Sequence, residues 1–267
     1  MEITHEGTEV LSQLSDYFNV YSDDHRMARA IKKKFDIKDV HVIPGDSDSN
    51  QTVKREIGRQ AGQLLESILY EDAIVSVTGG STMAYVSESI HLLPFNVFFV
   101  PARGGLGENM VYQANTISSS MAQQAGGYYT TLYVPDNVSE STYDTLMLEP
   151  SVIHTLDKIK QANVTIHGIG DALKMAHRRQ SPKEVIDKLQ HHQAVGEAFG
   201  YYFDAQGKVV HKVKTIGLQL EDLESKDFIF AVAGGQSKGE AIKAYLSIAP
   251  DNTVLITDEA AAKVILQ

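Results

Sequence analysis

Short apolar runs alternate with amphipathic stretches along most of the chain. The apolar runs predict buried strands, whereas stretches with apolar residues three or four positions apart predict helices. The predicted strands are residues 40–43, 73–77, 96–100, 129–134, 163–167, 228–233 and 253–257. Predicted helices such as residues 51–69 separate most of them. Strands that alternate with helices favour an α/β fold with a doubly wound, mostly parallel sheet.

Three stretches depart from this alternation. Residues 195–213 have period-two apolar positions and a turn at 204–207, which predicts a small antiparallel hairpin. Residues 173–181 are basic and are predicted to be irregular. Residues 7–34 have a helical pattern, either packed on the domain or forming a linker. We therefore divide the chain into N-terminal linker helices (1–35) and one domain (36–267).

Four of the predicted strands end in polar loops that contain glycine. These loops are residues 79–82, 103–109, 168–171 and 234–238. The carboxyl ends of parallel strands meet at one edge of a sheet, which is where α/β proteins bind ligands. One such loop alone is weak evidence for a ligand site, because ordinary turns also contain glycine. Four loops at one edge, two of them with a cation, favour a small anionic ligand over plain turns.

The loop after residues 73–77 is the strongest candidate for a phosphate site. Gly79 and Gly80 allow a ligand to approach the backbone, and the next helix would direct its first N–H groups at an anion. Ser81 and Thr82 could donate hydroxyls to that anion or cap the helix. The loop lacks the Walker spacing with its lysine and the three-glycine dinucleotide fingerprint. A plain strand-to-helix turn therefore remains the alternative.

Composition narrows the classes of function. The formal net charge of −10 argues against nucleic-acid binding by this chain alone, so an anion site depends on local cations. There is no cysteine, and the histidines are scattered, which disfavours a metal site. No run approaches the roughly 18 apolar residues of a membrane helix, and the first residues do not read as a signal peptide. We expect a cytoplasmic protein.

Several motifs together resemble the effector-binding domain of the sugar-sensing SorC/DeoR-type bacterial regulators. They run from about residue 20 to the C-terminus, and they are specific as a set although each is weak alone. In chain order they are PGDSDSNQTVKREIGRQAG, VSVTGGSTM, PARGG, HGIGDA, AVGEAFGYYFD and FAVAGGQSKGEAI.

The resemblance implies a fold similar to the ribose-5-phosphate isomerase and glucosamine-6-phosphate deaminase group. It also implies no catalytic residue and no cofactor, but a sugar-phosphate effector, fructose 1,6-bisphosphate, in a repressor of glycolytic genes. It implies that one phosphate is bound by a cradle of Gly79, Gly80, Ser81 and Thr82, with Arg103 and Lys238 as its cations. Gln113 and Glu197 would contact sugar hydroxyls, and Arg178 would contact a second phosphate.

Regulators of this type also carry an N-terminal winged helix-turn-helix that binds operator DNA. No such module is recognised in this sequence, which is expected to be an isolated effector domain. The resemblance implies contact with operator DNA only through that module. We expect a homo-oligomer, a dimer or tetramer, formed through the N-terminal helix and the hairpin edge.

Alternatives remain for single residues and for the whole chain. Arg178 and Glu197 could be surface residues, and Asp171 is expected to cap the helix that follows it. An isomerase or deaminase of the same fold would need an acid/base pair, yet no histidine follows residues 168–171 until His177. The other alternative is an oligomerisation domain with no ligand. Turnover of sugar phosphates would identify the enzyme, and ligand-induced stabilisation would exclude the structural domain.

Overall fold

A single large sheet forms the centre of the protein. The computed structural model describes residues 23–105, 109–135 and 138–267. Every pairing among the seven described strands of this sheet is parallel. In order across the sheet they are β1 (Asp39–Ile43), β11 (Thr253–Asp258), β10 (Phe228–Val232), β5 (Val164–His167), β2 (Ala73–Val77), β3 (Val97–Pro101) and β4 (Tyr128–Tyr129).

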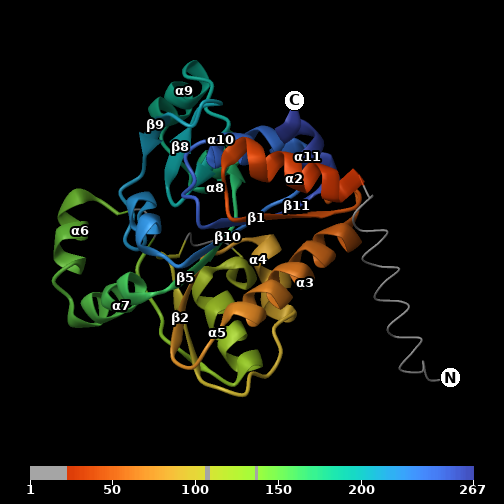
Figure 1. The fold of residues 1–267 in the computed structure, drawn as a ribbon. Coiled ribbons are helices and arrows are strands. Elements are labelled where there is room, and N and C mark those ends of the chain that lie inside the picture. Colours follow the sequence, from red (N-terminus) through yellow and green to blue (C-terminus); the bar gives the residue numbers. More distant parts are fainter. Residues whose placement is uncertain (1–22, 106–108, 136–137) are drawn as a thin grey trace.

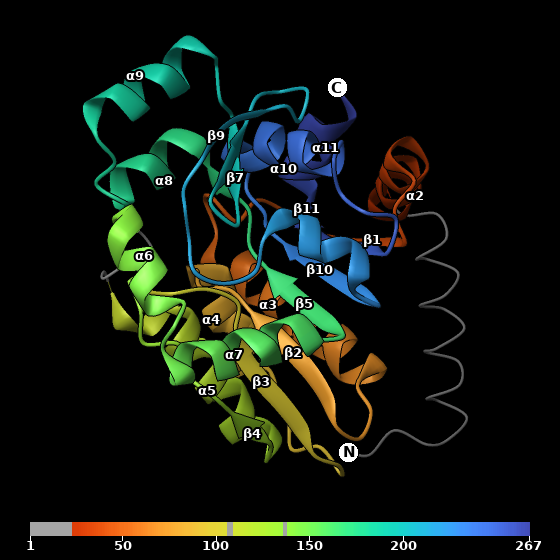
Figure 2. The same ribbon diagram turned by 90° about the vertical axis from the view of Figure 1, so that its left-hand side faces the viewer.

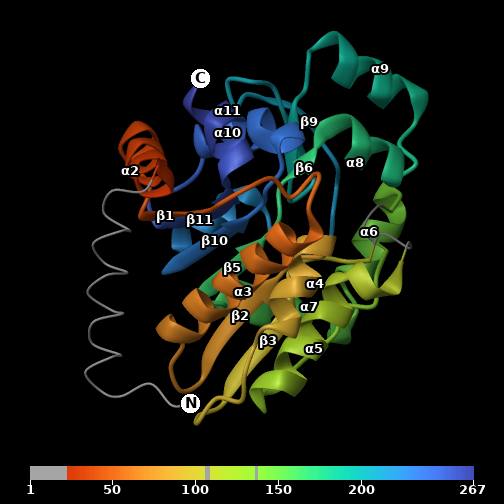
Figure 3. The same cartoon turned by 90° about the vertical axis from the view of Figure 1, so that its right-hand side faces the viewer.

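Helices cover both faces of this sheet, as the doubly wound prediction requires (Figures 1 and 3). One face packs against α3 (Gln51–Ile68), α4 (Ser81–Glu88) and α5 (Ala114–Ala125). The other packs against α2 (Asp23–Phe35), α7 (Pro150–Gln161), α10 (Gly239–Leu246) and α11 (Glu259–Leu266). In β2, Val75 and Val77 belong to the first core and Ile74 packs on the second. The strands are continuously apolar because both of their sides are covered.

A second, antiparallel sheet of four strands stands beyond the main sheet (Figure 2). It contains β6 (Gly170–Asp171), β7 (Gly196–Ala198), β8 (Tyr201–Phe203) and β9 (Val209–Lys212). Phe199 and Gly200, which join β7 to β8, both have positive φ (54° and 87°). A two-residue hairpin with two positive φ values is the type I′ turn that matches the twist of the strands. The hairpin predicted with a turn at 204–207 is the next pair, β8 and β9, where Gly207 N–H donates to Asp204 C=O (3.0 Å) and Asp204 N–H donates to Lys208 C=O (3.0 Å). That prediction is confirmed, whereas the turn at Phe199 and Gly200 was not predicted.

The remaining elements connect these layers. They are α6 (Glu140–Leu146), α8 (Ala172–Arg178), α9 (Lys183–His191) and the 3-10 turns η1 (Met110–Tyr112), η2 (Leu220–Ser225) and η3 (Gln236–Lys238). Of these, α8 and α9 lie beside the small sheet (Figure 2).

Two local predictions were wrong. Residues 173–178, the larger part of the stretch predicted to be irregular, are helical: Asp171 accepts a hydrogen bond from Lys174 N–H (2.8 Å) and caps helix α8, which ends at Arg178. The expected capping role of Asp171 is thereby confirmed. The strand predicted at 129–134 stops at Tyr129. The Asn115 side chain bonds both the N–H (2.8 Å) and the C=O (3.0 Å) of Leu132, so these groups do not extend the strand.

The N-terminal helix α2 belongs to the folded domain. Its buried residues Ala28 and Ile31 share a core with Ile265 of α11. Of the predicted linker helices, residues 1–22 lie outside the described ranges. Among the residues that the structure describes, none of the helices combines the length and apolarity needed to cross a bilayer.

Candidate ligand-binding site

A cavity of about 140 Å³ lies at the carboxyl edge of the large sheet. From β2 the chain proceeds through β3 and β4 on one side, whereas β5, β10 and β11 follow on the other side. The strand order therefore reverses between β2 and β5, and the loops after these two strands line the cavity. Ligands of doubly wound sheets bind at such a reversal. Thr78 Oγ1 accepts a hydrogen bond from Gly168 N–H (3.2 Å) and joins the two loops there.

The glycine loop after β2 forms one wall of the cavity. Gly80 has a φ of 131° and precedes α4 as its N-cap without a side-chain capping bond. The capping role considered for Ser81 and Thr82 is therefore wrong, and both residues line the cavity instead. The first intrahelical bond of α4 runs from Ala84 N–H to Gly80 C=O (3.1 Å), so the N–H groups before it have no intrahelical acceptor.

Position 79 needs a glycine because the backbone of Tyr112 passes close to it. A Cβ at this position would lie 2.5 Å from the carbonyl oxygen of Tyr112. That same carbonyl accepts a hydrogen bond from Gly80 N–H (2.8 Å). The loop after β2 is thereby fixed against η1 and the start of α5, where Gln113 also lines the cavity.

Four cationic side chains also line this cavity. Arg103 follows β3, Arg178 ends α8 with Arg179 next to it, and Lys238 ends η3 just before α10. The backbone around Arg103 pairs with a distant segment, because Gly104 N–H donates to Ile216 C=O (3.1 Å) and Leu218 N–H donates to Ala102 C=O (2.7 Å). Arg103 and Lys238 thus follow strands of the large sheet, whereas Arg178 lies between β6 and β7 of the small sheet.

The electrostatic environment at Lys238 is positive. Burial, together with the positive charges of Lys54, Lys174 and Arg178, lowers the pKa of Lys238 to about 8, and only Asp48 opposes this effect. A cluster of cations around a half-buried lysine favours the binding of an anion, which would restore the charged form of that lysine.

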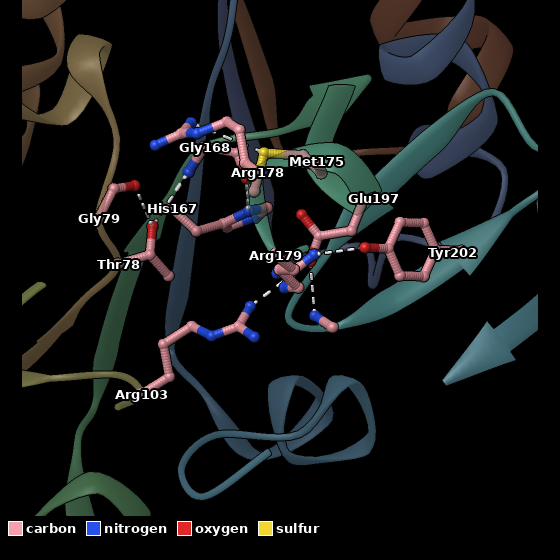
Figure 4. Close-up of polar contacts among 11 residues, drawn as sticks. Thr78, Gly79, Arg103, His167, Gly168, Met175, Arg178, Arg179, Glu197 and Tyr202 are labelled. Carbon is pink, nitrogen blue, oxygen red and sulfur yellow. Dashed lines mark hydrogen bonds and ion pairs between the residues drawn. The ribbon is translucent and has the colours of Figure 1, made fainter. Parts of the chain in front are cut away.

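On the opposite wall, Glu197 holds two arginines (Figure 4). Its Oε1 accepts hydrogen bonds from Arg179 Nη2 (2.8 Å), Arg103 Nη1 (3.4 Å) and Gly200 N–H (2.6 Å). Burial alone would raise the pKa of Glu197, but the charges of Arg179 and Arg103 outweigh it and lower that pKa. Arg179 also donates to Tyr202 Oη (2.8 Å). Glu197 is ionised, buried and part of a charged cluster.

A neutral, fully buried histidine precedes Gly168, which lines the cavity. Burial lowers the pKa of His167 to about 4. Its Nδ1 lies 3.0 Å from Gly168 C=O, which can only accept, so this nitrogen carries the hydrogen. Its Nε2 then accepts from Tyr245 Oη at 2.9 Å. His167 is a structural support of the Gly168 loop. Among the described residues, no group of three or more histidine, aspartate or glutamate side chains is arranged to hold a metal ion.

The structure brings every predicted site residue to this one cavity. Gly79, Gly80, Ser81, Thr82, Arg103, Gln113, Arg178, Glu197 and Lys238 all line it. That they bind a ligand stays a prediction. The idea that Arg178 and Glu197 are surface residues does not fit their position in the cavity, and Glu197 is only 4% exposed. Sequence reasoning missed Arg179, which it placed in an irregular basic stretch, and the connection between Thr78 and Gly168.

The sequence is similar to known proteins over its whole length. A protein-family model described as "Putative sugar-binding domain" matches residues 20–267. The central glycolytic genes regulator of Priestia megaterium is 46% identical over 266 residues, which are 98% of this chain and 78% of that protein. The regulator of the same name from Bacillus subtilis is 45% identical, over 100% of this chain and 79% of that protein.

Solved structures show the same fold. The "putative SorC family transcriptional regulator from Enterococcus faecalis" superposes with a TM-score of 0.86 at 43% identity, covering 91% of this chain and 100% of that one. The full-length sorbitol operon regulator SorC from Klebsiella pneumoniae has a TM-score of 0.84 at 18% identity. It covers 99% of this chain and 90% of that chain, and at this identity the likeness concerns the fold alone.

Proposed function

The chain belongs to the sugar-binding family of SorC-type transcriptional regulators, and from this premise we propose that its cavity binds a sugar phosphate, fructose 1,6-bisphosphate or a close relative. The family consists of regulators, so the isomerase or deaminase alternative is set aside. The relatives from Priestia megaterium and Bacillus subtilis share a name that refers to glycolytic genes, which supports a glycolytic metabolite as the effector.

One observation carries the proposal: two different walls of the same cavity both offer groups that bind anions. The first wall has the amides and hydroxyls of the loop at Ser81 and Thr82, with Lys238 nearby. The second has the guanidinium groups of Arg103 and Arg179 at Glu197, and Arg178, proposed to contact a second phosphate, also lines the cavity. A bisphosphate has an anionic group at each end, and guanidinium, ammonium and oriented amides are the groups that bind phosphate in proteins. Gln113 and Glu197 are proposed to contact the sugar hydroxyls between the two phosphates.

We further propose how binding regulates transcription. Residues 36–267 would act as the effector domain, residues 1–35 as a connection, and a separate N-terminal module would contact operator DNA. The sugar phosphate would bind one arrangement of the loops and subunit interfaces better than another, and only that difference can change DNA affinity. The protein would work in the cytoplasm as a homo-oligomer.

The proposal is tested by calorimetry and thermal unfolding with fructose 1,6-bisphosphate, and with fructose as the uncharged control. A ligand at about 100 times its Kd should stabilise the protein by about 2.7 kcal/mol. Thr82→Ala, Arg103→Ala and Lys238→Ala should each weaken bisphosphate binding, whereas Lys33→Ala on the exposed face of α2 should not. Undiminished affinity in all three cavity variants would contradict the proposed site.

A further inference from the structure

A lysine that does not line the cavity contacts a residue of the proposed phosphate-binding wall. Lys54 lies in the first turns of α3 and is half-buried. Its Nζ donates a hydrogen bond to Ser81 Oγ at 2.7 Å. Ser81 lines the cavity, but Lys54 does not. The lysine can therefore act on a ligand in two ways: through the serine hydroxyl, and through its charge, which lowers the pKa of Lys238.

The chemistry of this pair determines which way the serine hydroxyl donates. An ammonium group has three donors and no acceptor, so the Ser81 oxygen must be the acceptor in this bond. The hydroxyl hydrogen then has to point away from Lys54 and is available to an acceptor in the cavity. A phosphate offers only acceptors when it is fully ionised. Without the lysine, the hydroxyl could rotate and accept a hydrogen bond from a ligand instead.

The loop before α3 connects this pair to the loop that carries Lys238. Asp48 Oδ2 accepts from Ser237 N–H (2.7 Å), and Asp48 Oδ1 accepts from Ser237 Oγ (3.0 Å). The carboxylate of Asp48 also favours the charged forms of both Lys54 and Lys238. One segment, residues 48–54, therefore supports two groups of the first wall: the Ser81 hydroxyl and the Lys238 ammonium.

We propose that Lys54 is a positioning residue that fixes the Ser81 hydroxyl as a hydrogen-bond donor and so makes this end of the cavity select an ionised phosphate. This inference rests on the proposed function, because it concerns the same site. It adds a residue that lies outside the cavity and that the resemblance to known regulators did not supply.

The test is calorimetry with fructose 1,6-bisphosphate on Lys54→Met, Lys54→Arg, Ser81→Ala and the double variant Lys54→Met with Ser81→Ala. We expect Lys54→Met to raise the Kd about tenfold, as the loss of one hydrogen bond of a charged system implies. Lys54→Arg keeps the donor and the charge and should restore most of the affinity. In the Ser81→Ala background, Lys54→Met should have a much smaller effect, because the group through which it acts is gone.

The matched control is Lys33→Met, which removes the same charge from an exposed position on α2. Thermal unfolding of every variant without ligand shows whether the fold is retained. If Lys54→Met binds the bisphosphate as tightly as the unmodified protein while Arg103→Ala loses binding, the positioning role is wrong and the proposed function stands. An equal effect of Lys54→Met with and without Ser81 would also overturn it. If the unmodified protein does not bind fructose 1,6-bisphosphate, the proposed function fails and this inference fails with it.

Discussion

The two walls of the cavity consist of different chemical groups. The wall after β2 consists of backbone amides, small hydroxyls and a glycine that allows close approach. The wall at the small sheet consists of long charged side chains, Arg103 and Arg179, held by a single buried carboxylate. The loop of the first wall is one contiguous segment that packs against η1, whereas the charged side chains of the second wall come from three separate elements. Substitutions in the first should therefore affect binding most, and substitutions in the second should also affect folding.

The strongest test of this contrast is Glu197→Gln. The substitution leaves two arginines without their shared negative charge, in a cluster where the side chains of Arg179 and Glu197 are 1% and 5% exposed. Removing one partner of a buried ion pair is strongly destabilising, so we expect the free energy of unfolding to fall by about 3 kcal/mol. Urea denaturation followed by circular dichroism measures it.

The control for this measurement is Glu224→Gln, an exposed glutamate at which we expect almost no change. A loss below about 1 kcal/mol at Glu197, the size typical of exposed ion pairs, would show that the second wall is not a folding element.

Gly79→Ala tests the first wall. The new Cβ would lie 2.5 Å from Tyr112 C=O, so the loop has to move. Since one or two charged hydrogen bonds to phosphate would then be lost, we expect fructose 1,6-bisphosphate to bind about tenfold to hundredfold more weakly. Calorimetry measures this change. For stability alone, Gly168→Ala is the comparison, because its Cβ would approach nothing closer than 3.8 Å. Unchanged binding by Gly79→Ala would show that the contact between position 79 and Tyr112 C=O does not determine the shape of the binding loop.

The pH dependence of binding distinguishes the first wall, which contains Lys238, from the second wall, which contains arginines. The pKa of Lys238 is about 8 in the protein without ligand, and an anion beside it would raise that pKa. Binding therefore favours the protonated lysine: affinity is highest below pH 8 and falls as the pH rises above 8. Between pH 7 and 9 we expect bisphosphate affinity to fall about fivefold to tenfold. Calorimetry across this range gives the slope.

Phosphate itself is already doubly ionised in this range, because its second pKa is about 6. Lys238→Met should therefore flatten the profile. Arg178→Met should weaken binding and keep a slope, but move it to higher pH, because the charge of Arg178 lowers the pKa of Lys238. A slope that survives in Lys238→Met would assign the titration to another group.

The smallest effect is expected for Tyr202→Phe in the second wall. The phenol oxygen accepts the hydrogen bond from Arg179 Nη1 at 2.8 Å, and without it a buried donor loses one partner. We expect a loss of about 1 kcal/mol in the free energy of unfolding. Tyr133→Phe, at a tyrosine that is 84% exposed, is the matched control and should be neutral. Equal stabilities of the two variants would argue against a role of Tyr202 in the cluster.

The first wall was largely readable from the sequence, for a physical reason. A buried strand, two glycines and two hydroxyl residues are contiguous, and their geometry follows from the local chain. The parallel sheet was readable in the same way, since its strands are apolar on both faces. The early end of strand β4 could not be predicted from the local sequence. The side chain of Asn115, 17 positions before Leu132, binds the backbone of Leu132 and ends the strand pairing.

The second wall could be predicted only as a set of residues. The positions of Arg103, Arg178 and Glu197 came from a resemblance to known regulators, and no local pattern shows that Glu197 would join Arg103, 94 positions earlier. Arg179 looked like one of several solvated cations. Its burial depends on Tyr202 and Glu197, and neither is near it in sequence. Long-range pairs of charged side chains have no periodicity from which they could be read.

The pairing of Arg103 has a mechanical consequence. Its backbone forms a bridge with Gly217, while its guanidinium reaches across to Glu197 of the small antiparallel sheet. Arg103 thus connects three parts of the molecule at the cavity: the end of β3, the segment at Gly217 and strand β7 of the small sheet. A ligand that displaced this guanidinium would therefore be expected to move both the segment at Gly217 and the small sheet at Glu197.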